Sequence, residues 1–490
     1  MRIHRGWIVR VGLLFSLLVV LSCAVNPVTG KRELILMSES QEIALGQQSD
    51  PQIVAMFGLY DDAELAAYVD GIGQNLAAVS HKPDLKFTFR ILDSPVINAF
   101  ALPGGYVYVT RGILSHMNNE SELAVVLGHE IGHVTARHGA AQQSRATLAG
   151  LVLGVGSIFS EQVARFGGLA QSALGILFLK YGRDDEHESD QLGVQYSLAA
   201  GFDPERGAKF FEVLDRQSQE SGQSLPDWLS THPAPADRVE RTRQLARETK
   251  GAGPYRVGEG TYKGQIDGTV FGDDPRQGFM DGNVFKHPEL AFQLAFPPGW
   301  RVHNTPTAVV ALEPEKQAQL QMTLEPSEGL SPAAYVRRVA GNAEAQLVEG
   351  TAERIGGYDA YAAVLRVGDA SNTMLVQLVA IQRQAGEAMF QIVGVTASRF
   401  RAWQPQLLGT ARSFGALNDP AAQRIQPNRV DVVRVGGAGT LADVVSRYDN
   451  VPVTLHTLAL LNNLQNDQAL EPGFELKIVR GTFQPQSVAR

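Results

Sequence analysis

The segment HEIGH at residues 129–133 is the part of this 490-residue chain that decides its fold. It lies in a stretch rich in helix-forming residues, 120–138, which we expect to form one unbroken helix. On a helix the two histidines lie one turn apart on the same face, so both imidazoles can reach a single Zn²⁺ at roughly 2.0–2.1 Å. Glu130 then points toward a water on that metal. The segment therefore predicts a catalytic zinc centre with Glu130 as its general base. A chance pentapeptide in a helix with solvated histidines is the alternative, and the surrounding sequence must decide between them.

A catalytic zinc also needs a third protein ligand and one open coordination position. Glu186 is a candidate, because it lies on the next strongly helical stretch of the sequence, 184–200. Asp190 lies one turn further along the same helix face, where it could accept a hydrogen bond from a ligand histidine. Acidic clusters are usually only solvated helix faces, so the spacing alone leaves Glu186 open.

The composition narrows the class of protein. Hydrophobic residues make up 44% of the chain and charged residues 19%, which is enough apolar material for several cores in a multidomain protein. The formal net charge is −8, without a basic block, so nucleic acid is not expected as a partner. Cys23 is the single cysteine, which excludes an internal disulfide.

The N-terminus has the layout of an export signal. Three arginines within the first ten residues precede an apolar run, 11–21, that is short for a membrane-spanning helix. The sequence VLSC at 20–23 resembles the lipobox of bacterial lipoproteins, which implies that residues 1–22 are a signal peptide and that Cys23 is lipidated. Ala24, in place of Asp, implies the outer membrane. Plain secretion or an uncleaved anchor is the alternative.

Two regions flank the helix at 120–138. Before it, residues 87–92, 96–102 and 106–110 alternate in the manner of strands and predict a small sheet. After it, residues 141–180 are rich in glycine and small apolar side chains. That composition would suit a flexible flap over a cleft or insertion into a membrane surface, and equally a packed helical hairpin.

Several motifs together resemble the HtpX and CAAX-prenyl-protease type I family of zinc metallopeptidases, which are gluzincins, and within it the BepA-like periplasmic lipoprotein proteases. The resemblance spans roughly residues 24 to 250. It rests on HEIGHVTARH at 129–138 followed by Arg183, Glu186 and Asp190, and on NPVTG at 26–30, NAFALPGG at 98–105 and STHP at 230–233 with Arg238. Gly182 and Ser189 stand where the family more often has Ser and Ala, and both changes are small.

The resemblance implies a mainly helical zincin-like domain, residues 23–250, that binds one Zn²⁺ per chain. The ligands would be His129, His133 and Glu186, with Glu130 as general base and Asp190 beside a ligand histidine. His232 could approach the metal as a fourth, gating ligand or stabilise the tetrahedral oxyanion, with Arg238 supporting the same site. A structural His-Pro turn is the alternative for His232. We expect His138, near the helix end, to be structural and His187 to be solvated.

The resemblance also implies a binding surface for substrate. Residues Asn98, Ala99, Phe100 and Ala101 would form the edge strand of the cleft, where an extended peptide adds as a further strand through main-chain hydrogen bonds. An ordinary internal strand is the alternative.

The sequence beyond residue 250 predicts two further units. A linker, 251–277, leads to an α+β domain at 278–416 with mostly strands and helices at 333–347 and 400–413. After a second linker, 417–430, residues 431–482 resemble LysM modules in the order of their Gly-Thr-Leu, Leu-Asn and Leu-Glu-Pro-Gly segments. That resemblance implies a small βααβ fold that could bind the glycan of peptidoglycan.

These features predict a lipid-anchored metalloendopeptidase on the periplasmic side of a bacterial envelope. Its expected substrates are unfolded or misassembled envelope proteins, in protein quality control. Two alternatives stay open. One is an envelope assembly factor or chaperone with a latent metal site, and the other is a peptidoglycan-bound scaffold.

Overall fold

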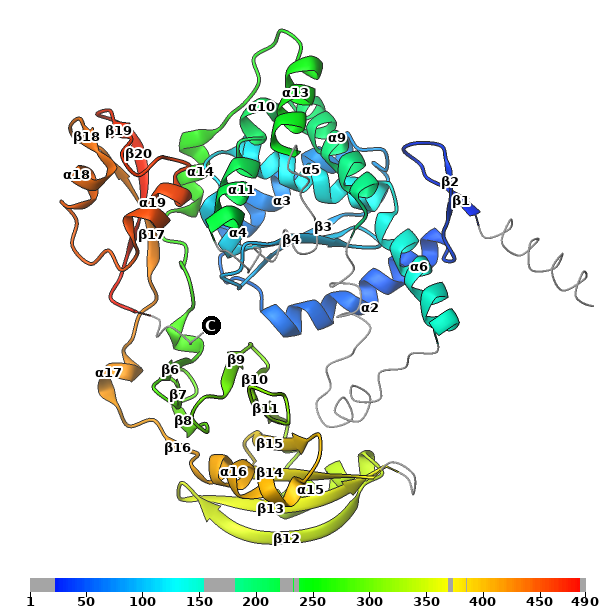
Figure 1. The fold of residues 1–490 in the computed structure, drawn as a ribbon, viewed down its shortest axis with the longest axis vertical. Helices are drawn as coiled ribbons and strands as arrows, with labels where there is room; N and C mark the ends of the chain where they lie inside the picture. Colours follow the sequence, from blue (N-terminus) through cyan, green and yellow to red (C-terminus); the bar gives the residue numbers. More distant parts are fainter. Residues whose placement is uncertain are drawn as a thin grey trace, which may run out of the picture.

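The computed structural model describes residues 23–153, 181–220, 232, 238–368, 373–384 and 386–484. The predicted signal peptide and the second part of the glycine-rich segment, 154–180, lie outside the described residues. A helical unit is at the top of Figure 1, the C-terminal residues lie beside it, and a sheet-rich unit lies below. This mixture of helices and sheets is the predicted α+β multidomain class. In the described part of the chain, none of the helices combines the length and apolar character that crossing a membrane requires.

A three-stranded sheet lies at the centre of the helical unit. Its strands are β3 (Thr88–Leu92), β4 (Ala99–Leu102) and β5 (Tyr106–Thr110), in the order β3-β5-β4. β3 runs parallel to β5, and β4 runs antiparallel to it after a turn in which Gly104 and Gly105 have φ of 86° and 95°. The predicted strands and turn are confirmed, and β4 is an outer strand of the sheet.

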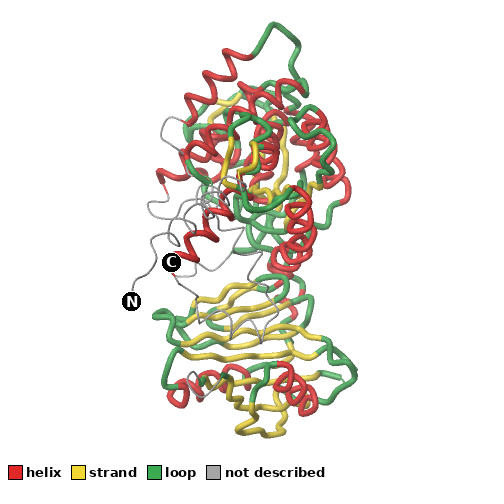
Figure 2. The backbone as a smooth tube through the Cα atoms, turned by 90° about the vertical axis from the view of Figure 1, so that its right-hand side faces the viewer, coloured by secondary structure: helices red, strands yellow, loops and turns green. Residues whose placement is uncertain are grey.

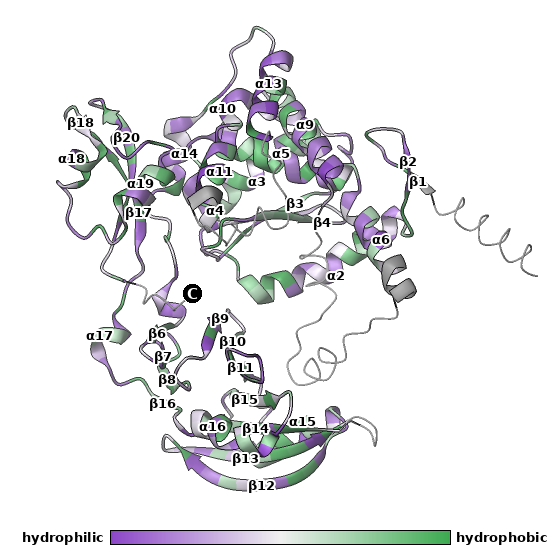
Figure 3. Cartoon of the chain, in the orientation of Figure 1, coloured by the Kyte–Doolittle hydropathy of each residue, from purple (hydrophilic) through white to green (hydrophobic). Residues whose placement is uncertain are grey.

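Helices cover both faces of this sheet. α2 (Glu39–Phe57) packs below it, where Ile53 contacts a cluster formed by Phe100 and its neighbours. α3 (Ala63–Ala78) and α5 (Glu120–Thr135) pack on the opposite face. A capping box at Ser38 begins α2. In Figure 3, α3 and α5 carry many hydrophobic residues, in keeping with their burial.

The helix that contains the HEIGH segment is shorter than expected. α5 ends at Thr135, and a second helix, α6 (His138–Leu153), begins in a new direction. Arg137, between them, has a left-handed φ of 62°. Its guanidinium donates to the Glu42 carboxylate and to the Met37 carbonyl, 2.9 Å away. The prediction of an unbroken helix to residue 138 is wrong, because these contacts to α2 outweigh the local helix propensity.

The remaining helices of this unit follow the second part of the glycine-rich segment. They are α9 (Arg183–Ala199), α10 (Pro204–Gly207), α11 (Phe210–Glu220) and α13 (Arg238–Thr249), while α4 (Arg111–His116) precedes α5. A short N-terminal hairpin of β1 (Cys23–Val25) and β2 (Arg32–Leu34) lies near α6.

Residues 251–277, which we expected to be a linker, are partly built into the helical unit. They contain α14 (Glu259–Ile266) and a short 3-10 helix, Pro275–Gln277. Tyr262 and Ile266 belong to the same hydrophobic core as α3 and α5, and both are 0% exposed. The expected linker is therefore wrong for this stretch.

A seven-stranded antiparallel sheet forms the lower unit, and its strands run side by side in Figure 2. In spatial order they are β12 (Gln346–Ile355), β13 (Tyr358–Val367), β14 (Met374–Gln382), β15 (Met389–Thr396), β11 (Ala318–Glu325), β10 (Ala308–Leu312) and β9 (Arg301–Asn304). Helices α15 (Pro332–Asn342) and α16 (Phe400–Arg412) pack on it. The helix expected at 333–347 is too long, because residues from 346 onward pair with β13 as a strand.

A second, smaller sheet belongs to the same unit. It has four strands in the order β16 (Gly415–Ala416), β8 (Phe292–Ala295), β7 (Val284–His287) and β6 (Phe279–Asp281). Its Phe292 packs among the same core residues as the seven-stranded sheet.

The C-terminal unit follows a single turn of helix, α17 (Pro420–Gln423). Its main elements are β17 (Arg429–Arg434), α18 (Leu441–Val445), α19 (Leu455–Leu461) and β20 (Glu475–Arg480), with β17 antiparallel to β20. Two short strands, β18 (Gly439–Thr440) and β19 (Ala469–Leu470), pair between them. The LysM interpretation of these residues stays a prediction.

Candidate metal centre

Close packing of α5 against α9 places the candidate ligands together. A Cβ on Gly132 of α5 would lie 3.1 Å from Cβ of Leu192 on α9. A Cβ on Gly193 of α9 would lie 2.9 Å from the Val125 carbonyl oxygen of α5. Because neither position carries a side chain, the two helices approach closely. Glu186, in the first turn of α9, then reaches the histidines of α5.

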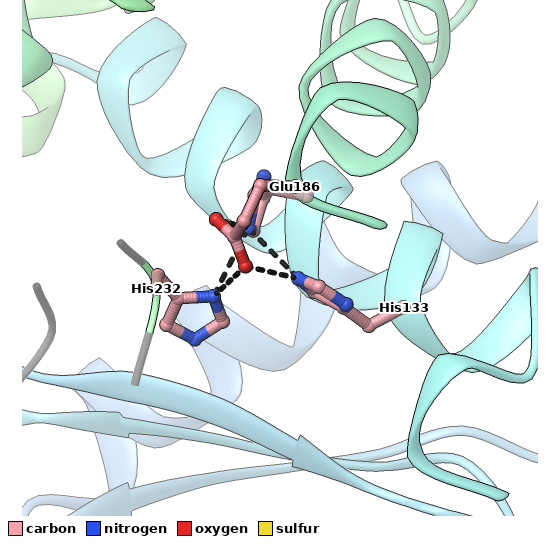
Figure 4. A group of neighbouring side chains, drawn as sticks. His133, Glu186 and His232 are labelled. Atoms are coloured by element: carbon pink, nitrogen blue, oxygen red, sulfur yellow. Dashed lines mark hydrogen bonds and ion pairs between the residues drawn. The ribbon is translucent and has the colours of Figure 1, made fainter. Parts of the chain in front are cut away.

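Four buried side chains converge on one point (Figure 4). His129, His133, Glu186 and His232 each present a ligand atom, and these atoms all lie within 4.8 Å of one another. Figure 4 labels three of them, His133, Glu186 and His232. Nε2 of His129 and Nε2 of His133 are 3.0 Å apart, and Oε1 of Glu186 is 3.4 Å from Nε2 of His133. Nδ1 of His232 lies 3.3 Å from Nε2 of His129 and 3.0 Å from Oε1 of Glu186.

These distances fit one zinc ion. Tetrahedral zinc with ligand bonds of roughly 2.0–2.1 Å holds its ligand atoms roughly 3.3 Å apart. The four separations above range from 3.0 to 3.4 Å. Three imidazole nitrogens and a carboxylate oxygen are also donors that zinc accepts. The structure thus brings the three predicted ligands together, and Nδ1 of His232 would be a fourth donor to the same ion.

Glu130 is a buried carboxylate beside this group. It is 0% exposed, and neither of its oxygens has a hydrogen-bond partner among the described residues. Its Oε1 lies 3.7 Å from Nε2 of His232. An uncompensated buried carboxylate costs several kcal/mol. Its position is therefore consistent with a water or a substrate amine that binds between Glu130 and the metal.

Arg238 and Asp190 lie behind the ligands. Arg238 donates to Asp190 Oδ1 over 2.6 Å and to Glu186 Oε2 over 3.1 Å. Asp190 Oδ1 is also 3.1 Å from Nδ1 of His129. Burial alone would raise the pKa of Asp190, but Arg238 and His129 outweigh burial and hold this pKa below its ordinary value. An ionised Asp190 can fix the tautomer that leaves Nε2 of His129 facing the metal.

The pKa of Glu186 is also held low. Burial again opposes ionisation, but the charge of His232, hydrogen bonds from His133 and His232, and Arg238 together keep the pKa of Glu186 well below its ordinary value. The carboxylate is therefore ionised and ready to bind a cation.

Two residues at the site were not expected from the sequence. Nδ1 of His138 lies 3.0 Å from Nδ1 of His133, although we expected His138 to be only structural. The ring of Tyr181 stacks on the ring of His133, with centroids 3.9 Å apart. His187, expected to be solvated, instead has Nε2 2.5 Å from Nη1 of Arg241.

The predicted substrate strand lies next to the metal ligands. Asn98 precedes β4, and Ala99, Phe100 and Ala101 lie within it. Among the described residues, β4 pairs with β5 on one side and with no strand on the other. A small cavity is lined by Ala101 and the two residues after it, together with His133 and Tyr181. Whether substrate binds along β4 stays a prediction.

Comparison with known proteins shows which family the residues around this site resemble. The model of Peptidase family M48 matches residues 63–246, which contain the whole group of four. These residues form a domain of peptidase family M48. The family resemblance inferred from the sequence motifs is confirmed, and zinc is the metal that the M48 domain and its donor set indicate.

Curated relatives match less than half of this chain. The putative beta-barrel assembly-enhancing protease of Vibrio cholerae is 36% identical over 199 residues, 38% of this chain and 40% of its own. The beta-barrel assembly-enhancing protease of Escherichia coli K12 is 31% identical over 224 residues, 44% of this chain and 45% of its own. The mitochondrial metalloendopeptidase OMA1 of Schizosaccharomyces pombe is 30% identical over 230 residues, 46% of this chain and 66% of its own.

The chain spans less than half the length of the first of these relatives. Similarity to solved structures is low. A cyanobacterial PsbP from Synechocystis sp. PCC 6803 is 15% identical and covers 28% of this chain and 94% of its own, with a TM-score of 0.23. That TM-score supports no conclusion about function.

Proposed function

We propose that the chain is a zinc-dependent endopeptidase that hydrolyses peptide bonds in unfolded or misassembled envelope proteins. The observation that supports it best is the buried group of His129, His133 and Glu186 around one point. Beside it lies the carboxylate of Glu130, which has no hydrogen-bond partner among the described residues. Relatives named for β-barrel assembly support an envelope substrate. The predicted lipobox supports a lipid anchor at Cys23 in the outer membrane.

The residues have distinct tasks in this reaction. When bound, zinc supplies Lewis-acid polarisation of the scissile carbonyl and makes a water more acidic. Glu130 accepts a proton from the attacking water and passes it to the leaving amine. Asp190 and Arg238 orient His129 and Glu186 from behind. The outer edge of β4 binds an extended substrate through main-chain hydrogen bonds, which favours unfolded chains of varied sequence.

Glu130→Gln tests this mechanism. The variant keeps the size of the side chain but cannot take up a proton, so we expect cleavage of an unfolded protein to fall by about 10²- to 10⁴-fold. Zinc content, measured by atomic absorption on the chain from residue 24 onward, should equal that of the unchanged protein. Wild-type cleavage by Glu130→Gln would exclude Glu130 as the general base.

A second candidate function is an assembly factor whose metal site is latent. The observation in its favour is His232, which completes four protein ligands around the proposed metal and so leaves no open vertex. The Glu130→Gln variant separates the two functions in cells. Full rescue of the envelope defect of a deletion strain by this variant would favour the assembly factor.

The C-terminal residues 431–482 add a third element to the proposal, glycan binding by a LysM-like module. The order of β17, α18, α19 and β20 is compatible with the expected βααβ arrangement. Sedimentation with purified peptidoglycan, with and without residues 431–482, tests it. If sedimentation is equal for both chains, the module is not a wall anchor.

A further inference from the structure

His133 is held from behind by a second histidine. If Nε2 of His133 faces the metal, its Nδ1 carries the proton and must donate it. The atom 3.0 Å away is Nδ1 of His138, which must therefore be the acceptor. Ser189 Oγ lies 3.2 Å from the same nitrogen and cannot accept from it in this arrangement, because that nitrogen carries no proton. The proton of His138 is then on its Nε2.

A carboxylate accepts that proton. Oε2 of Glu188 lies 3.4 Å from Nε2 of His138, whereas the nearest oxygen of Asp185 is 4.0 Å away. Each of the two helix histidines that face the metal thus has a carboxylate behind it. Asp190 contacts His129 directly, and Glu188 reaches His133 through His138. Partners of this kind fix the orientation and tautomer of metal-binding imidazoles.

Glu188 is held in turn by the N-terminal hairpin. Nδ2 of Asn26 donates to Oε1 of Glu188 over 3.4 Å and to Oε1 of Glu33 over 2.8 Å. Asn26 is 0% exposed, and its Oδ1 accepts from the main-chain N–H of Val28 over 2.8 Å. The Asn26 side chain is therefore locked in place by its own turn. These hydrogen bonds explain how a polar residue can be fully buried in this hairpin.

We propose that the N-terminal hairpin, residues 23–34, is a positioning element of the metal centre, acting through Asn26, Glu188 and His138 on His133. The proposal rests on the proposed zinc function, because only a metal at Nε2 of His133 fixes the direction of the hydrogen bonds. It also gives a role to the NPVTG segment, which neither the metal ligands nor the β4 edge uses. The predicted lipid attachment at Cys23 lies three residues before Asn26, so the anchor and the metal centre share one structural element.

Zinc affinity is the measurement that tests the proposal. The purified chain from residue 24 onward is titrated with zinc against a chelating dye, in the Glu130→Gln background so that no self-cleavage interferes. We expect His138→Ala and Glu188→Ala to weaken zinc binding about 10- to 100-fold, as removal of such partners does elsewhere. Asn26→Ala should weaken it less, and its effect should vanish when Glu188 is already Ala, because the two act in series.

Two controls separate positioning from general damage. Glu188→Gln keeps an acceptor for the His138 proton and should restore much of the affinity that Glu188→Ala loses. Asp184→Ala removes an exposed carboxylate from the first turn of the same helix and should bind zinc normally. The absorption spectrum of the Co²⁺-loaded protein should shift for His138→Ala and not for Asp184→Ala.

Unchanged zinc affinity and an unchanged Co²⁺ spectrum in His138→Ala and Asn26→Ala would overturn the proposal, even if the chain is an active peptidase. A chain that binds zinc with the expected order of affinities but cleaves nothing would instead overturn the proposed function alone.

Discussion

His232 is the residue whose position bears most directly on activity. Its Nδ1 occupies the fourth vertex around the proposed metal, where a catalytic site keeps a place for water. We expect His232→Ala to open this vertex, so that an unfolded substrate is cleaved faster at saturation while zinc is bound more weakly. Measuring kcat and zinc affinity on the same preparation checks both effects.

A lower kcat in His232→Ala would indicate a different role for this residue. If His232 stabilises the oxyanion instead, its loss should lower kcat by about 10²- to 10³-fold, with zinc affinity unchanged. His81→Ala is a suitable control, because His81 contacts Tyr196, outside the group of four, and should leave kcat unaltered.

Some residues of this site can be predicted from the sequence, and others cannot. His129, Glu130 and His133 follow from helical spacing alone, whereas Glu186 needed the family resemblance because acidic clusters are common. His138 could not be found by spacing. His138 lies five residues beyond His133, so on a continuous helix its side chain would point away from His133. The helix break at Arg137 turns it back toward His133.

At the scale of elements, the distance between α5 and α9 sets the geometry of the ligands. Gly193→Ala would place a Cβ 2.9 Å from a main-chain carbonyl of α5, which cannot rotate away. We expect a loss of about 1–3 kcal/mol in unfolding free energy, as for other overpacked contacts. Zinc affinity should fall as well, because His129 and Glu186 lie on the two separated helices. Denaturant unfolding and a zinc titration measure the two effects.

A matched glycine on another helix provides the control. Gly71 lies in α3, and a Cβ added there would meet nothing within 4 Å. Because alanine has a better helix propensity by about 1 kcal/mol, Gly71→Ala should be neutral or stabilising. If Gly193→Ala and Gly71→Ala had the same unfolding free energy and zinc affinity, the close approach of α5 and α9 would not be needed for stability or metal binding.

The end of α4 predicts a pH dependence. Burial lowers the pKa of His116 from 6.5 to about 4, with its ring within 2.8 Å of the Gly112 carbonyl. A depressed histidine pKa contributes stability that is present above pH 6.5 and is lost as the pH falls through 4. Between pH 7 and pH 4, the wild-type chain should therefore lose up to about 3 kcal/mol more than His116→Gln. Urea unfolding across this range measures the difference, and His303→Gln, at an exposed position, should follow the wild type.

Element boundaries show what a single sequence leaves undetermined. The alternation in β3 to β5 is a local signal, and these strands were predicted. The end of α5 and the strand β12 depend on distant partners, which are α2 for Arg137 and β13 for β12. Local propensity favours a helix in both places, and tertiary contacts override it.

At the scale of the whole molecule, side-chain hydrogen bonds as well as the covalent chain join the C-terminal unit to the M48 domain. Lys477 of β20 is 0% exposed, and its Nζ donates to the carbonyls of Ser115 and Met117, each 2.7 Å away at the end of α4. Arg216 of α11 donates to the Leu464 carbonyl over 2.8 Å. The sequence suggested a separate module, residues 431–482, behind a linker at 417–430. The contacts instead join this unit to α4 and α11 of the helical unit.

Burial of Lys477 makes this junction testable. Burial lowers the pKa of Lys477, and it raises the pKa of the nearby Glu122 to about 7. Lys477→Met keeps the apolar stem but leaves two buried carbonyls without a donor, which costs about 1–3 kcal/mol. We expect this loss to appear as faster hydrogen exchange in α4 and the start of α5, and not only in the C-terminal unit. Arg434→Met, in the same unit but with a 73% exposed side chain, should change stability by less than about 0.5 kcal/mol. If Lys477→Met speeds hydrogen exchange in residues 431–482 alone, the C-terminal unit does not stabilise the helical unit. If exchange in α4 and α5 becomes faster as well, the C-terminal unit stabilises the helix that carries the metal-binding histidines.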